Sequence, residues 1–119
     1  VYECMGDMVE GWGAEFVGKY GYSEIGAVVG ATHPAEAKIL RDRLAHTFFL
    51  VPGYGAQGGN AEMLKNCFDK NGLGGIVNNS RGILCAYKKN GGTYYEAARA
   101  ACIAMQKDLV SVLGEICAK

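Results

Sequence analysis

The chain lacks the features that mark several large classes of protein. None of its apolar runs approaches the roughly 18 residues that a membrane-spanning helix needs, so we expect no membrane partner. Its 12 basic and 12 acidic residues balance. It therefore has no basic excess with which to bind nucleic acid. With 50% of its 119 residues apolar and only two prolines, the composition is that of a globular domain.

Paired cysteines and metal-ligand clusters are also missing. The five cysteines are odd in number and contain no C-x-x-C pair, which argues against a disulfide framework and against a zinc site. Unpaired cysteines favour a reducing compartment, and we expect a cytoplasmic protein. His33 and His46 have no acidic or cysteine companion at ligand spacing, so we expect capping or surface roles for them and no metal.

Short apolar runs alternate with helical periodicity along the chain. We expect strands over 25–32, 47–52 and 75–79, helices over 2–16, 33–45, 60–70 and 93–118, and a connecting stretch over 82–92. This alternation predicts an α/β fold with parallel strands joined by crossover helices. Because all three strands are continuously apolar, we expect both faces of their sheet to be covered.

A glycine-rich turn follows the second expected strand. It reads Pro-Gly-Tyr-Gly-Ala-Gln-Gly-Gly over 52–59. Glycines let backbone N–H groups approach a ligand closely, and such amides suit an anion, most often phosphate. The next strand ends in Asn-Asn-Ser-Arg-Gly over 78–82, with a single arginine, Arg81. Two successive strand ends, one offering amides and Gln57 and the other a guanidinium, predict a phosphate clamp.

Three other interpretations of these residues differ in their requirements. The loop formally matches G-x-G-x-x-G, but a dinucleotide-binding fold needs an acidic residue after the next strand, and 77–81 contains none. No Gly-Lys-Ser or Gly-Lys-Thr follows, which excludes a P-loop. A tight turn without a ligand is the third, yet four glycines within seven residues exceed what we expect a turn to need. Arg81 alone would be expected as a surface arginine.

Three segments, 28–32, 49–59 and 76–83, resemble the orotidine 5′-phosphate decarboxylase family, most closely its bacterial branch with the loop Pro-Gly-Tyr-Gly-Ala-Gln-Gly-Gly. The resemblance spans nearly the whole chain, in order and at matching spacing. It implies a TIM (β/α)₈ barrel, of which residues 1–119 would form the C-terminal half, from about the fifth helix through the eighth βα unit, with no second domain. The two loops would then follow strands seven and eight, where such barrels commonly bind phosphate.

The family resemblance also implies an activity and a site. It implies a carbon–carbon lyase that converts orotidine monophosphate to UMP and CO₂ in the last step of de novo pyrimidine biosynthesis, usually as a homodimer, without metal or organic cofactor. Gln57 and Arg81 correspond to phosphate-binding side chains, completed by the amides around Ser80. The residues implied to grip the phosphate are Gln57, Arg81, Ser80, Gly58 and Gly59, and those implied in the mobile lid loop are Pro52, Gly53, Tyr54 and Gly55.

The chain departs from the family pattern in one respect that concerns activity. The family's Asp-x-Lys-x-x-Asp motif is absent, and we interpret Asp42, Lys107 and Asp108, on expected helices, as solvated surface charge. Val1 is not an initiator methionine, so we expect a piece of a longer protein. Three strands leave two open edges and cannot close a barrel. We therefore expect the 119 residues alone not to decarboxylate.

Two further functions remain open from the sequence. One is a free-standing half-barrel that binds a phosphate or nucleotide ligand or serves in assembly. The other is a different phosphate-binding barrel, such as a sugar-phosphate decarboxylase or aldolase, against which the Ala-Gln-Gly-Gly and Asn-Ser-Arg-Gly pair argues. The sequence leaves Tyr54 between lid contact and loop filling, and we expect Cys85 and Tyr87 to serve packing.

Overall fold

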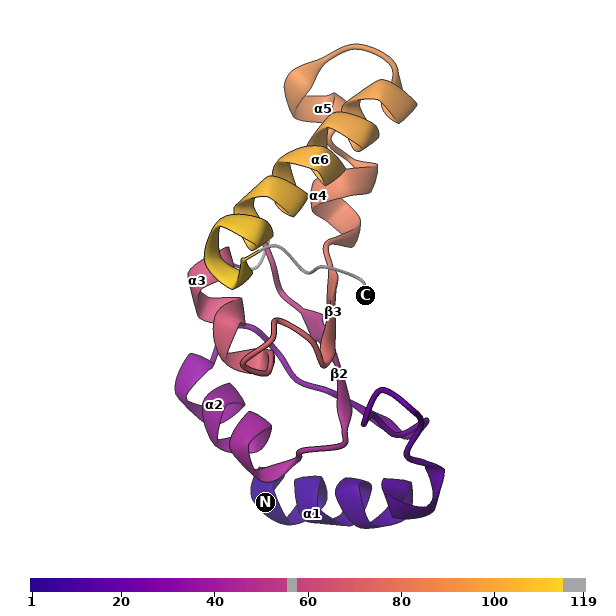
Figure 1. The fold of residues 1–119 in the computed structure, drawn as a ribbon. Helices are drawn as coiled ribbons and strands as arrows, with labels where there is room; N and C mark the ends of the chain where they lie inside the picture. Colours follow the sequence, from indigo (N-terminus) through magenta and orange to yellow (C-terminus); the bar gives the residue numbers. More distant parts are fainter. Residues whose placement is uncertain (56–57, 115–119) are drawn as a thin grey trace.

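A three-stranded parallel sheet lies at the centre of the computed structural model, which describes residues 1–55 and 58–114 (Figure 1). The strands are β1 (Gly26–Val28), β2 (Phe48–Pro52) and β3 (Gly75–Asn78), in the order β1-β2-β3. Helix α2 (Pro34–Arg43) connects β1 to β2. Helix α3 (Ala61–Leu64) and the 3₁₀ turn η2 (Lys65–Cys67) connect β2 to β3. The predicted α/β fold class, with parallel strands and crossover helices, is confirmed, and the arrangement fits half of a (β/α)₈ barrel.

The remaining helices extend the molecule at both ends. Helix α1 (Tyr2–Gly13) continues into the 3₁₀ turn η1 (Ala14–Phe16) and lies across one end. Helices α4 (Ser80–Leu84), α5 (Tyr87–Asn90) and α6 (Tyr94–Leu113) form the other (Figure 1). The overall shape is elongated, with extents of 47 × 35 × 21 Å. Within the described residues, no helix combines the length and the apolar character that crossing a bilayer requires.

The hydrophobic core lies on one face of the sheet, where α2, α3 and α6 cover the strands (Figure 1). Phe49 and Val51 are two residues apart on β2 and therefore point to the same side of the sheet, since successive side chains of a strand alternate. Both are fully buried there. Leu44, Leu64 and Cys67 meet them from the helical side. Burying one large aliphatic or aromatic side chain contributes roughly 1.5–3 kcal/mol. This face therefore holds the strands and crossover helices together.

The opposite face of the sheet is open. Val28, Leu50 and Ile76 stand on it with 71%, 41% and 58% of their surface exposed. The prediction that both faces are covered is therefore wrong for this chain. In a closed (β/α)₈ barrel this kind of face turns inward and is filled by layers of side chains from all eight strands. Three strands cannot enclose such an interior, so their apolar residues on that side remain exposed.

Several predicted boundaries shift for local reasons. The first strand is shorter than 25–32, although the N–H of Val29 still donates to Leu50 O at 3.0 Å. The predicted helix over 60–70 ends at Cys67. It ends early because the Asp69 carboxylate accepts the backbone N–H groups of Asn71 and Leu73, at 2.7 and 2.9 Å, and closes a separate turn.

The C-terminal third of the chain is more helical than predicted. The stretch 82–92 contains most of α4 and all of α5, so its assignment as a connection is wrong. Helix α6 ends at Leu113, where Gly114 takes a φ of 79° that favours glycine; 115–119 lie outside the described residues. Along one face of α6, Ala98, Ala101, Met105, Leu109 and Val112 are half-buried, whereas Tyr94 at its start is exposed.

The N-terminal helix α1 is amphipathic, and its charged side faces the rest of the protein. Glu3 and Asp7 both bind the Arg43 guanidinium of α2. Met5 and Trp12, on the apolar side, are about half exposed. Helix α1 is therefore attached to α2 through these ion pairs and through the buried Gly6, which lies against Leu40 and Leu44.

A buried arginine links the amino-terminal ends of β2 and β3. The Arg41 guanidinium donates to the backbone carbonyls of Leu44, Thr47 (3.0 Å) and Gly74 (3.2 Å), and its carbon lies 4.1 Å from the centroid of the Phe49 ring. Desolvation lowers the pKa of this guanidinium. Buried carbonyls need partners, and one planar group here supplies donors to three of them.

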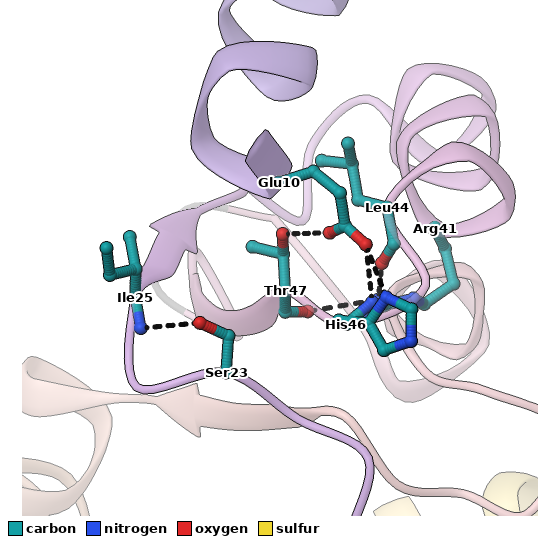
Figure 2. Close-up of polar contacts among 7 residues, drawn as sticks. All are labelled: Glu10, Ser23, Ile25, Arg41, Leu44, His46 and Thr47. Carbon is teal, nitrogen blue, oxygen red and sulfur yellow. Dashed lines mark hydrogen bonds and ion pairs between the residues drawn. The ribbon is translucent and has the colours of Figure 1, made fainter. Parts of the chain in front are cut away.

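A carboxylate from α1 completes this polar cluster (Figure 2). Glu10 accepts hydrogen bonds from the Thr47 hydroxyl at 2.5 Å and from the backbone N–H of His46 at 2.9 Å, and its Oε1 lies 2.8 Å from His46 Nδ1. Burial raises the pKa of the Glu10 carboxyl, but these hydrogen bonds outweigh burial, so its pKa lies below the ordinary 4.5. The start of β2 is thus held from α1 and α2 together.

The Arg41 contacts predict a large difference between two arginines on the same helix. Replacing Arg41 with methionine keeps the aliphatic length but leaves three carbonyls without their donor, at about 1–3 kcal/mol for each one that stays unpaired. Arg43→Met removes only exposed ion pairs and serves as the matched control. We expect the first variant to lose far more free energy of unfolding in denaturant titrations. Equal losses would mean that the carbonyl contacts contribute nothing particular.

The Glu10 cluster predicts a change in acid stability. A group whose folded pKa is lowered contributes stability above its ordinary value of 4.5, and this contribution is lost as the pH falls through the folded pKa. Thr47→Val removes one donor with little change in shape, so the pKa of Glu10 should rise and the protein should lose less stability on acidification. An NMR titration of the Glu10 carboxyl, with unfolding measured across the same pH range, tests this. An unchanged pKa of Glu10 would contradict it.

Candidate functional site

The register of β2 and β3 brings two loops together. Pro52, the last residue of β2, lies opposite Asn78, the last residue of β3. The chain leaves both strands at the same edge, which in parallel α/β sheets is where ligands bind. Between the two loops lies a cavity of about 130 Å³, lined by Pro52, Gly53, Tyr54, Asn78, Asn79, Ser80 and Arg81. The structure therefore unites residues from both halves of the predicted phosphate clamp.

The glycine-rich loop after β2 is a tightly bonded turn. The N–H of Gly59 donates to Gly53 O at 3.0 Å, and a Cβ on Gly59 would stand 2.6 Å from that oxygen. Gly55 has a φ of 71°, which a side chain would strain. Gly53 and Gly58 also have positive φ values. The turn itself thus requires all four glycines, and our expectation that their number exceeds what a turn needs is wrong.

The amides predicted to bind phosphate are occupied within this loop. The N–H of Gly58 donates to Gly55 O at 2.9 Å, and that of Gly59 is bonded to Gly53. Neither residue lines the cavity. Either amide could contact a phosphate only if the loop gave up these hydrogen bonds. The role of Gly58 and Gly59 in phosphate binding stays a prediction. Gln57 lies outside the described residues.

The loop after β3 is organised by Asn79. Its side chain caps α4 by accepting the N–H of Gly82 at 3.2 Å, and its amide donates to the sulfur of Met105 on α6 at 3.7 Å. Glycine at position 82 leaves room for this cap, because a Cβ there would lie 2.2 Å from the Asn79 oxygen and displace it. The cap fixes the start of α4, whose first residues, Ser80 and Arg81, have N–H groups without partners inside the helix.

Arg81 gives the cavity its positive charge. The side chain is exposed and forms no ion pair with a described residue. Ser80 lies beside it, with its hydroxyl donating to Asn78 Oδ1 at 3.2 Å. No carboxylate is among the residues that line the cavity. A guanidinium, a hydroxyl and helix-start amides without a competing anion suit an anionic group.

Tyr54 forms the wall of the cavity on the side of the β2 loop. Its hydroxyl donates to the Asp108 carboxylate of α6 at 2.5 Å, and its ring packs against the hydrophobic core. Burial and the adjacent carboxylate raise the pKa of Tyr54 to about 12, so it is a protonated donor at neutral pH. Asp108 is exposed, as expected of a solvated surface charge, but it also accepts this hydrogen bond from Tyr54. Asp42, by contrast, forms an exposed pair with Lys38, as such a surface charge should.

Sequence reasoning missed Asn78 and Asn79. Both line the cavity, and the Asn79 side chain also contacts Met105 of α6. Asparagine is a preferred residue immediately before a helix, so a signal for the cap was present. The predicted Pro52, Gly53, Tyr54, Ser80 and Arg81 do converge on the cavity.

A second hollow has several of its polar groups bonded to one another. A hollow of about 540 Å³ lies at the opposite end of the sheet, next to α2 and η2. There Tyr22 bonds Asp69 at 2.6 Å, Lys38 pairs with Asp42, and Arg41 serves the carbonyls already described. In the part of the chain that the structure describes, no group of three or more His, Cys, Asp and Glu side chains is placed to hold a metal ion, and the four described cysteines are free.

No protein-family model matches the chain, but individual proteins do. An orotidine 5′-phosphate decarboxylase of Clostridium botulinum (strain Langeland) is 54% identical over 112 residues, which are 92% of this chain and 38% of that protein. The solved OMP decarboxylase of Leishmania donovani superposes with a TM-score of 0.59 at 27% identity, covering 91% of this chain and 38% of that one.

A further solved structure supports the fold alone. A Toxoplasma gondii protein assigned as an orotidine-monophosphate decarboxylase superposes with a TM-score of 0.70 at 22% identity, over 96% of this chain and 43% of that one. These matches confirm the resemblance seen in the sequence. The chain thus belongs to the orotidine 5′-phosphate decarboxylase family, and it spans 38–40% of the length of curated relatives it matches.

Proposed function

We propose that this chain carries the phosphate-binding part of an orotidine 5′-phosphate decarboxylase, which converts orotidine monophosphate to UMP and CO₂. The observation that carries the proposal is the cavity between the ends of β2 and β3, where Arg81 and Ser80 face Tyr54. The 54% identity to a bacterial decarboxylase supports the choice of substrate. Residues 1–119 would correspond to the fifth helix through the eighth βα unit of the barrel.

The size and charge of the cavity suit one end of a nucleotide. About 130 Å³ is well below the roughly 300–1,000 Å³ of pockets that enclose a drug-sized ligand. The space therefore suits a phosphate group, and the ribose and base would extend beyond it. Arg81 can form a charge-assisted hydrogen bond with the phosphate, and the first amides of α4 add donors. Gln57, Gly58 and Gly59 belong to the same proposed grip.

The phosphate is remote from the carbon that loses CO₂, yet its binding can accelerate the reaction. Decarboxylation leaves a carbanion on the pyrimidine, which a nearby ammonium and preorganised charge would stabilise. Binding energy at the phosphate can offset the cost of desolvating and orienting the reacting end, and of closing the loop from Pro52 to Gly59 over the nucleotide. The side chains of this cavity would thus contribute to rate without touching the bond that breaks.

The expected partners follow from the same proposal. The substrate and product are small nucleotides, and the intact protein would act as a homodimer in the cytoplasm. The lysine and aspartate set that the reaction needs would lie outside residues 1–119. We therefore propose that the chain alone binds a nucleotide phosphate without catalysing its decarboxylation.

Arg81→Ala tests the proposed phosphate site. In the protein as expressed from its gene, we expect this variant to bind UMP about 10–100-fold more weakly, because a hydrogen bond to a charged group contributes about 1.5–3 kcal/mol. Turnover of orotidine monophosphate should fall as well. Arg99→Ala, which removes an exposed arginine from α6, is the matched control and should leave both unchanged. Wild-type kinetics in Arg81→Ala would overturn the assignment.

The isolated 119-residue chain tests the division of labour. Calorimetry should detect UMP binding, and an assay of CO₂ release from orotidine monophosphate should show no turnover. Release of CO₂ by the isolated chain would mean that the catalytic groups lie within it. Nucleotide binding without turnover by the gene's full product would instead favour a free-standing binding module.

A further inference from the structure

Helix α6 contacts both loops that form the proposed phosphate site. On the β2 side, the Tyr54 hydroxyl donates to Asp108 at 2.5 Å. On the β3 side, the Asn79 amide donates to the sulfur of Met105 at 3.7 Å. Met105 and Asp108 are three residues apart, so they lie on the same side of the helix, one turn from each other. A single helix face thus holds one residue from each wall of the cavity.

Tyr54 is held both through its backbone and through its side chain. Its backbone pairs with Gly59 in a parallel bridge that closes the glycine-rich loop. Its ring packs against the hydrophobic core, and its hydroxyl reaches α6. The two loops lie close at Gly55, the next residue, where an added Cβ would stand 3.6 Å from Asn79 Oδ1. The placement of Tyr54 therefore affects how closely the two walls approach.

From these contacts we propose that Asp108 is a positioning residue for the phosphate site, acting through Tyr54. Asp108 does not line the cavity, whereas Tyr54 does. The Asp108 carboxylate lies outside the cavity and holds Tyr54 in place by accepting the hydrogen bond from its hydroxyl. The inference rests on the proposed function, because the ligand whose affinity it sets is the phosphate monoester of a nucleotide.

The chemistry of the pair explains why an acceptor is needed at position 108. A tyrosine hydroxyl that is partly withdrawn from water favours a hydrogen-bond partner, and an ionised acceptor gives a stronger bond than a neutral one. Without the acceptor, the Tyr54 ring could turn about its side-chain bonds, and the wall opposite Arg81 would lose its fixed position. Misplacing a binding group by a fraction of an ångström is costly in sites that depend on preorganisation.

The experiment compares UMP with uridine, which lacks the phosphate, as ligands of the protein expressed from its gene. We expect Asp108→Ala to weaken UMP binding about tenfold, as for loss of one charge-assisted hydrogen bond, and to leave uridine binding unchanged. Tyr54→Phe, which keeps the ring, should do the same. Asp108→Asn retains an acceptor and should restore most of the UMP affinity. Asp42→Ala removes an exposed carboxylate from α2 and should behave as wild type.

A double variant separates positioning from general destabilisation. If Asp108 acts through Tyr54, Asp108→Ala combined with Tyr54→Phe should bind UMP about as well as either single variant. Additive losses, equal losses for UMP and uridine, or wild-type UMP binding by Asp108→Ala would each overturn the inference. Thermal melting shows whether each variant is folded. If Asp108→Ala is unfolded, the comparison of UMP with uridine is made with Tyr54→Phe instead. If the wild-type protein binds UMP no better than uridine, the proposed function fails and the positioning role fails with it.

Discussion

The buried Arg41 guanidinium is the contact on which the arrangement of β2 and β3 depends. It donates to carbonyls at the start of both strands and stacks on Phe49, which lies at the centre of the core. Fixing two parallel strands at their amino ends also fixes their carboxyl ends, because each strand advances by about 3.3 Å per residue. Pro52 and Asn78 therefore end level with one another, and the two loops that follow begin side by side.

This arrangement separates the two ends of the sheet by function. At the amino end, Glu10 binds His46 and Thr47, and Arg41 binds three backbone carbonyls. At the carboxyl end, Arg81 forms no ion pair with any described residue, and no carboxylate lines the cavity beside it. Charge that is satisfied internally stabilises a fold, whereas charge left facing a cavity is available to a ligand. Arg81, unpaired among the described residues and beside a cavity that no carboxylate lines, supports placing the site there.

The sequence was informative wherever structure follows from neighbouring residues. The alternation of three strands with crossover helices, the strands β2 and β3, and the convergence of Arg81 with Tyr54 could be predicted, because strand ends and turns have local signatures. The hydrogen bonds from Tyr54 to Asp108 and from Asn79 to Met105 could not, since they join residues 54 and 26 apart in the chain. The exposed face of the sheet could not be predicted either. Continuous apolar strands indicate burial, but they do not say whether the chain itself supplies the covering residues.

The exposed face of the sheet needs further strands to cover it, whereas the cavity is lined by residues of this chain. Those residues belong to the two loops that follow β2 and β3. The face that presents Val28, Leu50 and Ile76 is apolar and contributes no acid, base or ammonium, and enclosing it would require further strands. Binding at the loops and chemistry elsewhere are therefore physically separable. In a complete enzyme they would be coupled only because one nucleotide spans both, which is how remote binding energy can raise the rate of a reaction.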